Sequence, residues 1–224
     1  AGANQILVTV KNGGKDLISV VDNGCGMTEE DARLAVERHA TSKIRDEEDL
    51  FHIRTLGFRG EALAAIAAVS HFELLTCADE ASGGIRMAIQ GGFLDHLGRT
   101  GFPQGTKITI ERLFYNTPAR LKFLKTTATE LHHIQSWITQ QALSHPEIQF
   151  RLTHNQQLLL HLPGSQTLEA RVQQFFGEEF RDTLLEVAHE EAYLRYDGLV
   201  SLISKPRTSR RWQYLFVNGR AVKC

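Results

Sequence analysis

The stretch VVDNGCGM, residues 20–27, closes a run of β-branched residues with an acid and then sets two glycines one residue apart. Such a run predicts a strand, so Asp22 is expected at its end. A carboxylate there can accept a hydrogen bond from an exocyclic amine such as that of adenine, and Gly24 and Gly26 would let a flat base approach the backbone. The same pattern is also typical of a strand that ends in an Asx-type turn with no ligand.

The residues on either side predict a hairpin and a capped helix. Residues 5–10 and 16–21 are β-rich runs joined by KNGGK, where Asn12 and Gly13 suit positive-φ turn positions. Thr28 precedes an acidic first turn and is expected to cap a helix that ends near His39 or Ala40.

Strands are expected further on at about 71–77, 84–90 and 106–112. The glycine-rich stretch 78–105, apart from its short strand, predicts a mobile excursion of the kind that can serve as a lid.

The second half of the chain predicts another α+β unit. A helix from Thr129 should stop before Pro146, a hairpin should turn at His154 and Asn155, and Thr167 should cap a further helix that Gly177 ends. Strands follow at about 184–190, 192–204 and 212–217. We therefore expect two domains, residues 1–125 and 126–224.

Composition bounds the class of protein. The 224 residues are 42% hydrophobic and 23% charged, as in ordinary globular proteins, with a formal net charge of -1 that excludes a uniformly basic nucleic-acid binder. Three cysteines without CxxC spacing predict reduced thiols. The sequence has no apolar run long enough to span a membrane and no leader pattern, so we expect a cytoplasmic protein with no membrane partner.

Positive charge is nevertheless concentrated near the C-terminus, because no acid follows Asp197. The cations there form a candidate polyanion surface, although a solvated tail would look the same. They are Lys205, Arg207, Arg210, Arg211, Arg220 and Lys223.

The stretch LGFRGEALAAIAAVS, residues 56–70, predicts a helix preceded by glycine, a cation and glycine. A helix start with free N–H groups and a guanidinium suits a polyphosphate. Glu61 favours the other interpretation, since an acid in a first turn stabilises the helix dipole without a ligand. In RHATSKI, residues 38–44, Thr41, Ser42 and Lys43 can likewise bind phosphate or hold a lid, but such loops are common.

The sequence has no GxxxxGK[ST], no GxGxxG between a strand and a helix, and neither GxSxG nor HExxH. The adjacent His132 and His133 point about 100° apart on a helix, so no protein-held metal site is predicted.

In their order along the chain, DNGCGM, HATSKI, LGFRGEAL, the GT of QGTKITI and LFYNTPARLKFLK resemble the MutL family of DNA mismatch-repair proteins, within the GHKL ATPase superfamily. DxGxG is shared across the superfamily, whereas GFRGEAL, FYNTPARLKFL and FVNGR are specific to MutL-like proteins.

The resemblance implies an α+β protein, in which an ATP-binding α/β sandwich with helices on one face of a mixed sheet precedes a ribosomal-protein-like α+β domain. It also implies an ATP-driven N-terminal dimer that clamps DNA and couples a mismatch-recognition protein to strand processing. The residues implied in ATP binding are Asp22, Gly24, Gly26, Met27 and Thr106 around the base, Thr41, Ser42 and Lys43 in the lid, and Gly57, Phe58, Arg59, Gly60 and Glu61 under the phosphates.

The family also places a glutamate base and an asparagine that holds magnesium in a helix ending in DAGA, of which this sequence has only Ala1, Gly2 and Ala3. A lysine that contacts the γ-phosphate is placed beyond Cys224. We therefore expect ATP and magnesium as cofactors of the parent ATPase, and no hydrolysis by these 224 residues. The alternatives are the ATPase region of a type II topoisomerase-like protein and an ATP-independent DNA-binding scaffold.

Overall fold

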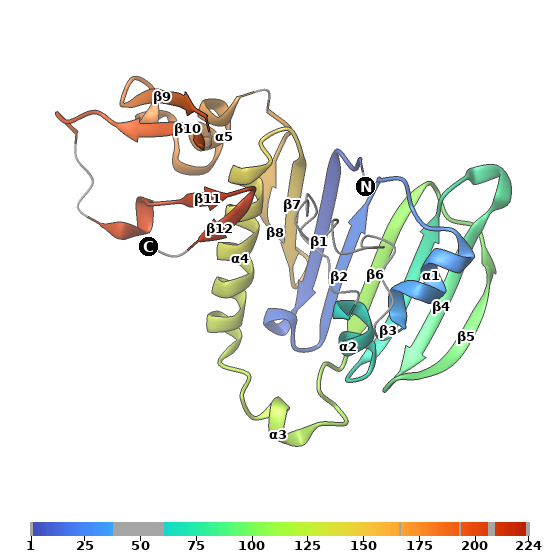
Figure 1. Cartoon of the computed structure of the whole chain (residues 1–224). Coiled ribbons are helices and arrows are strands. Elements are labelled where there is room, and N and C mark those ends of the chain that lie inside the picture. The colour runs from blue at the N-terminus through green and yellow to red at the C-terminus, as the bar shows by residue number, and fades with distance from the viewer. Residues whose placement is uncertain (1, 38–60, 166, 193, 206–208, 223–224) are drawn as a thin grey trace.

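The computed structural model describes residues 2–37, 61–165, 167–192, 194–205 and 209–222. One large mixed sheet dominates the fold, with strand order β5-β4-β3-β6-β2-β1-β7-β8 (Figure 1). Its strands are β1 (Gln5–Lys11), β2 (Leu17–Asp22), β3 (His71–Cys77), β4 (Gly84–Gln90), β5 (Phe93–Thr100), β6 (Gly105–Glu111), β7 (Gln149–His154) and β8 (Gln157–Leu162).

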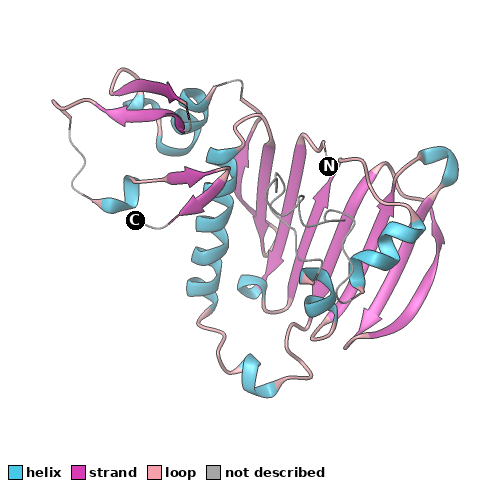
Figure 2. Cartoon of the chain, viewed as in Figure 1, coloured by secondary structure: helices cyan, strands magenta, loops and turns pink. Residues whose placement is uncertain are grey.

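Three helices cover one face of this sheet (Figure 2). They are α1 (Glu29–Val36), α2 (Ala62–Ala67) and α4 (Thr127–Ser144), and a short α3 (Pro118–Leu121) precedes α4. None of the helices in the described part of the chain is long and apolar enough to cross a membrane.

The strand registers explain why the helices share a face. Val8 lies opposite both Leu152 and Val20, and the same row continues through Ile108 and Leu74. Directly opposite residues point to the same side of a sheet. One apolar row therefore runs across the strands and supplies two cores on the same face.

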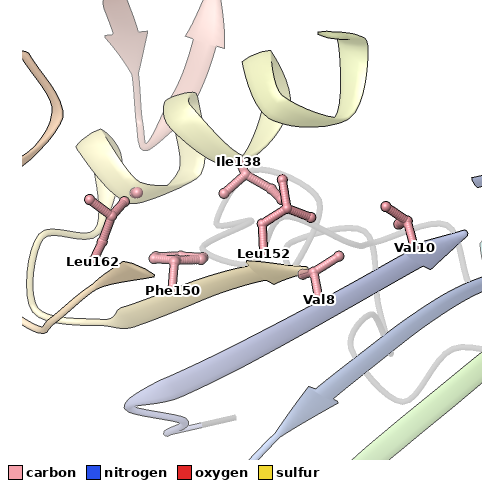
Figure 3. Close-up of a cluster of buried hydrophobic side chains, with 7 residues drawn as sticks. Val8, Val10, Ile138, Phe150, Leu152 and Leu162 are labelled. Carbon is pink, nitrogen blue, oxygen red and sulfur yellow. The ribbon is translucent and has the colours of Figure 1, made fainter. Parts of the chain in front are cut away.

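The first core lies under α4 and the second under α1 and α2. Ile138 of α4 packs toward Leu152, Phe150 and Val8, as Figure 3 shows. Ala32 of α1 and Ala67 of α2 are buried with β3 and β4 side chains. The opposite face carries polar pairs such as Arg86 and Glu73, whose side chains are 2.7 Å apart. The predicted mixed sheet with helices on one face is confirmed.

Most predicted local elements are also confirmed. Asn12 and Gly13 have φ of 50° and 66° in the β1–β2 turn, and Thr28 caps α1 by accepting a hydrogen bond from the Asp31 backbone N–H. The α1 helix ends at Val36, earlier than expected, and the turn after β7 uses Asn155 and Gln156 rather than His154 and Asn155.

The expectation of a mobile excursion over residues 78–105 is wrong for residues 93–100. They form β5, which pairs antiparallel with β4 and makes one edge of the sheet. Glycine-rich composition suggested a loop, but Gly91 and Gly92 supply the positive-φ turn of a hairpin.

The sheet also extends past the expected domain boundary at residue 125. β7 pairs in parallel with β1, and β8 then pairs with β7. The helix α4 is the crossover that a parallel connection requires. The predicted boundary at residue 125 therefore lies between strands of the large sheet and not after its last strand.

The remaining residues form a smaller α+β part. It contains α5 (Leu168–Phe176), β9 (Leu184–Glu191) paired with β10 (Leu194–Ser201), and β11 (Leu215–Val217) paired with β12 (Arg220–Val222). Thr167 and Gly177 bound α5 as predicted.

An aromatic cluster of Phe176, Phe180, Trp212 and Tyr214 joins the ends of this part, with ring centroids 5.2–6.0 Å apart. Burial raises the pKa of the Tyr214 hydroxyl.

The helix α5 is tied to the α4–β7 connection by Arg171. This side chain is fully buried, and its Nη2 donates to the carbonyls of Pro146 and Ile148. Desolvation lowers the pKa of the guanidinium, while the nearby Glu147 acts in the opposite direction.

Candidate functional site

Three polar side chains line up at one end of the large sheet. Asp22 of β2 lies opposite Thr106 of β6, and Thr106 lies opposite Thr76 of β3. All three therefore point to the helix-covered face, two residues along the strands from the apolar row. Thr76 is fully buried and Thr106 is 8% exposed, whereas Asp22 is half-buried. The row thus runs from the core to an accessible carboxylate.

The two threonines hold the following turn in place. The backbone N–H of Met27 donates to Thr76 Oγ1 at 2.8 Å, and Thr76 Oγ1 lies 3.1 Å from Thr106 Oγ1. Thr76 Oγ1 also lies 3.1 Å from the carbonyl oxygen of Gly105, to which it can donate. The sequence predicted Thr106 as a site residue but missed Thr76.

The turn has the hydrogen bond expected of the Asx-type interpretation of DNGCGM. Gly24 N–H donates to Asp22 Oδ1 at 2.9 Å, which is the predicted Asx-type turn. The second carboxylate oxygen of Asp22 can accept from a ligand amine. Gly26 has φ of +64°, and a Cβ there would lie 1.9 Å from the carbonyl oxygen of Cys77. Gly26 is therefore required by close contact with the end of β3.

Asn23, the other polar residue of the turn, was also missed from the sequence. Its Oδ1 accepts from the backbone N–H groups of Asn4 and Gln5 at 3.1 and 3.0 Å, and its Nδ2 donates to Asn4 Oδ1 at 2.7 Å. Asn23 thereby ties the turn to the start of β1. The sequence contains no pattern from which this role of Asn23 could have been predicted.

Several predicted residues fall outside this geometry. Thr41, Ser42, Lys43, Gly57, Phe58, Arg59 and Gly60 lie outside the described residues. Glu61 is the N-cap residue of α2, close to the predicted helix start, and makes no side-chain capping hydrogen bond there.

The predicted cationic surface is described only in part. Lys205 and Arg210 are exposed and Arg220 is half-buried. Arg207 and Lys223 lie outside the described residues, as does the side chain of Arg211.

A hollow on the same face of the sheet is apolar. It measures about 560 Å³ and lies between α4 and the first two strands. Its walls include Ile6, Val8 and Val20 from the sheet and Ile134 and Trp137 from α4. We name it the α4 groove.

The side chains of Asp22, Thr106 and Thr76 offer hydrogen-bonding groups to a ligand. They do not include a nucleophile paired with a general base. A carboxylate beside hydroxyl groups suits the edge of a base that carries an amine next to an acceptor. Within the described ranges, no three His, Cys, Asp or Glu side chains come together as a metal site.

Comparison with known proteins gives a consistent result. Residues 172–224 match the family model described as DNA mismatch repair protein, C-terminal domain. The chain is 48% identical over 223 residues to DNA mismatch repair protein MutL of Symbiobacterium thermophilum, covering 100% of this chain and 35% of that protein. It thus spans about a third of the length of such relatives.

Solved structures show the same similarity in three dimensions. The Aquifex aeolicus MutL ATPase domain complexed with ADP superposes with a TM-score of 0.75 at 27% identity, covering 99% of this chain and 76% of that one. The N-terminal domain of a DNA repair protein shares the fold, with a TM-score of 0.78 at 24% identity over 99% and 70% of the two chains.

Proposed function

The chain belongs to the MutL family of DNA mismatch repair proteins, and we propose on that premise that its large sheet binds the adenine of ATP at Asp22. The observation that carries this proposal is the row of Asp22, Thr106 and Thr76, with a half-buried carboxylate beside two hydroxyl groups. The Aquifex aeolicus MutL ATPase domain complexed with ADP has the same fold at 27% identity, which supports a nucleotide as the ligand.

Each remaining residue of the predicted site has a role in this proposal. Gly24 and Met27 bring the turn over the base, since Gly24 orients the Asp22 carboxylate and Met27 is fixed to Thr76. On the resemblance, we also propose that Gly57, Phe58, Arg59, Gly60 and Glu61 contact the phosphates and that Thr41, Ser42 and Lys43 take part in ATP binding.

ATP hydrolysis requires more than these residues supply. The resemblance places the family's glutamate base and magnesium-binding asparagine in a helix just ahead of the tail Ala1–Gly2–Ala3. The α4 groove is apolar and adjacent to β1, so we propose that this helix lies there. A general base alone contributes about 10²- to 10⁴-fold to a rate.

Titration calorimetry with ADP and ATP tests the binding site. We expect weak binding to the wild-type chain and at least a tenfold loss, about 1.4 kcal/mol, in Asp22→Asn, which replaces an acceptor with a donor facing the amine. Asp95→Asn makes the same charge change on the exposed strand β5 and should bind like the wild type. Equal affinities for Asp22→Asn and the wild type would refute the site.

At the level of the whole protein, we propose that ATP binding drives N-terminal dimerisation and closes a clamp on DNA. The clamp would connect a mismatch-recognition protein to strand processing. We propose that it acts in the cytoplasm. The family model matched by residues 172–224 supports a mismatch-repair role for the smaller part of the chain.

We propose the C-terminal cations as the DNA-contacting surface of this assembly. Replacing Arg207, Arg210 and Arg211 with Glu should weaken DNA binding at low salt at least about tenfold, because each phosphate contact is electrostatic. The same charge change at Arg33, Arg181 and Arg195, whose side chains are all exposed, serves as the control. Equal losses in both triple variants would indicate only a net-charge effect and would contradict the assignment.

A further inference from the structure

Asn23 lies where the backbone ladder between β1 and β2 stops. The last paired residues of that ladder are Ile6 and Asp22. Beyond them the Asn23 side chain takes over the pairing, because its Oδ1 accepts from the backbone N–H groups of Asn4 and Gln5 at 3.1 and 3.0 Å. The start of β1 is therefore held on this side by a side chain of the turn.

The amide of Asn23 has one consistent orientation. Its Oδ1 faces two backbone donors, so its Nδ2 faces Asn4 Oδ1, to which it donates at 2.7 Å. The backbone of Asn4 is itself fixed on its other side, since its carbonyl oxygen accepts from the backbone N–H of Gln149 at 2.8 Å. Asn23 therefore anchors the turn to a residue that β7 also holds.

The peptide group after Asn23 carries the N–H that orients the Asp22 carboxylate. Gly24 N–H donates to Asp22 Oδ1 at 2.9 Å, which leaves Oδ2 for a ligand amine. The Cα of Asn23 is also confined from the side of β6, because a Cβ at Gly105 would lie 3.1 Å from it. Fixing Asn23 therefore fixes the plane of this peptide group, and with it the direction of the carboxylate.

The Asn23 contacts lie at the surface, since Asn23 and Asn4 are both exposed. If the Asn23 amide is removed, water can bond to the N–H groups of β1, so the stability of the fold should change little. Water does not hold the turn in one conformation, however. The turn would then have to become ordered when a ligand binds, and that ordering lowers affinity.

We propose that Asn23 is a positioning residue for the nucleotide, which bonds to the start of β1 and so preorganises the Asp22 carboxylate for the adenine amine. The inference rests on the proposed ATP site and adds a residue whose amide is committed to β1 and not to the ligand. Its contribution is to the affinity for nucleotide more than to the stability of the fold.

Calorimetric titration of ADP into the 224-residue chain tests this role, with urea denaturation of the same variants. Asn23→Ala removes all three bonds, and we expect the dissociation constant for ADP to rise about tenfold, the scale of ordering the backbone of one residue. Asn23→Asp keeps the acceptor oxygens, and the Asn4 amide can turn to donate to it. It should bind ADP like the wild type at physiological ionic strength, which screens the added charge.

Asn12→Ala is the matched control, because Asn12 lies in the turn at the other end of β1 and its side chain bonds to Asp16 and Thr127. Asn12 has φ of 50°, so alanine there should lower the urea midpoint more than Asn23→Ala does and leave ADP affinity unchanged. Equal losses of affinity in Asn12→Ala and Asn23→Ala would show that any weakening of the fold costs affinity, and would overturn the inference. An Asn23→Asp variant as weak as Asn23→Ala would overturn it as well.

The same titrations separate this inference from the proposed function. If the wild type binds ADP and Asp22→Asn weakens that binding while Asn23→Ala does not, the site stands and the role of Asn23 is refuted. If the wild type binds no ADP, the proposed site fails and the inference fails with it.

Discussion

At the scale of single residues, two glycines allow the end of the sheet to close around the polar row. A Cβ at Gly26 would lie 1.9 Å from Cys77 O, and one at Gly105 would lie 2.2 Å from Asp22 O. Both residues have positive φ, +64° and +133°. The turn therefore packs against the end of β3, and the start of β6 packs against the end of β2, at distances that leave no room for a side chain.

Gly26→Ala is therefore expected to lower the free energy of unfolding by at least about 2 kcal/mol, because the substitution combines a strained φ with a backbone clash. Urea denaturation measures this change. Gly101→Ala is the control, since a Cβ at Gly101 has nothing within 4 Å and should change the free energy by less than about 0.5 kcal/mol. Equal midpoints for the two variants would contradict the expected clash.

At the scale of elements, α1 connects the site to the core. Thr28 Oγ1 accepts from Asp31 N–H at 3.2 Å and donates to Asp31 Oδ2 at 2.8 Å. These two bonds fix Thr28, the residue after Met27, as the N-cap of α1. Ala32, on the inward face of the first turns, is fully buried against β3 and β4 side chains. The cap therefore determines where α1 begins relative to the turn that contains Gly24, Gly26 and Met27.

Thr28→Ala should cost about 1 kcal/mol of stability, since it removes the acceptor for a helix N–H. Thr28→Ser keeps that acceptor and should recover most of the loss. Thermal unfolding followed by circular dichroism compares the two. A serine variant as unstable as the alanine variant would show that the methyl group, not the cap, matters.

At the scale of the whole molecule, the large sheet defines a unit that includes α4, β7 and β8. Val8 and Val10 of β1 are buried only because α4 and β7 cover them. We propose that the boundary between the two parts lies after Leu162, where β8 ends, rather than at residue 125. The Arg171 contacts with Pro146 and Ile148 then join the smaller part to the sheet unit.

This proposal predicts the behaviour of two truncated chains. A chain of residues 1–165 should unfold cooperatively in urea, because it keeps all eight strands. A chain of residues 1–125 should not, because it leaves the apolar face of β1 without α4 and β7. Comparable cooperative transitions for both chains would instead place the boundary at residue 125.

The local features of this protein were predictable from its amino-acid sequence. Asp22 at a strand end, the Asn12–Gly13 turn and the Thr28 cap were predictable, because each depends on dihedral preferences and hydrogen bonds between near neighbours in the chain. The order of motifs likewise identified the family, since that order is a property of the sequence alone.

Contacts between residues far apart in the chain became known only from the three-dimensional fold. The β1–β7 pair joins residues more than a hundred positions apart, and Thr76 reaches Thr106 only through the register of β3 on β6. Alternation of Phe72 and Leu74 with Thr76 did place a hydroxyl on the buried face, a signal that would have marked Thr76. Its partner could not be predicted, because a shift of one residue in strand register moves every side chain to the opposite face.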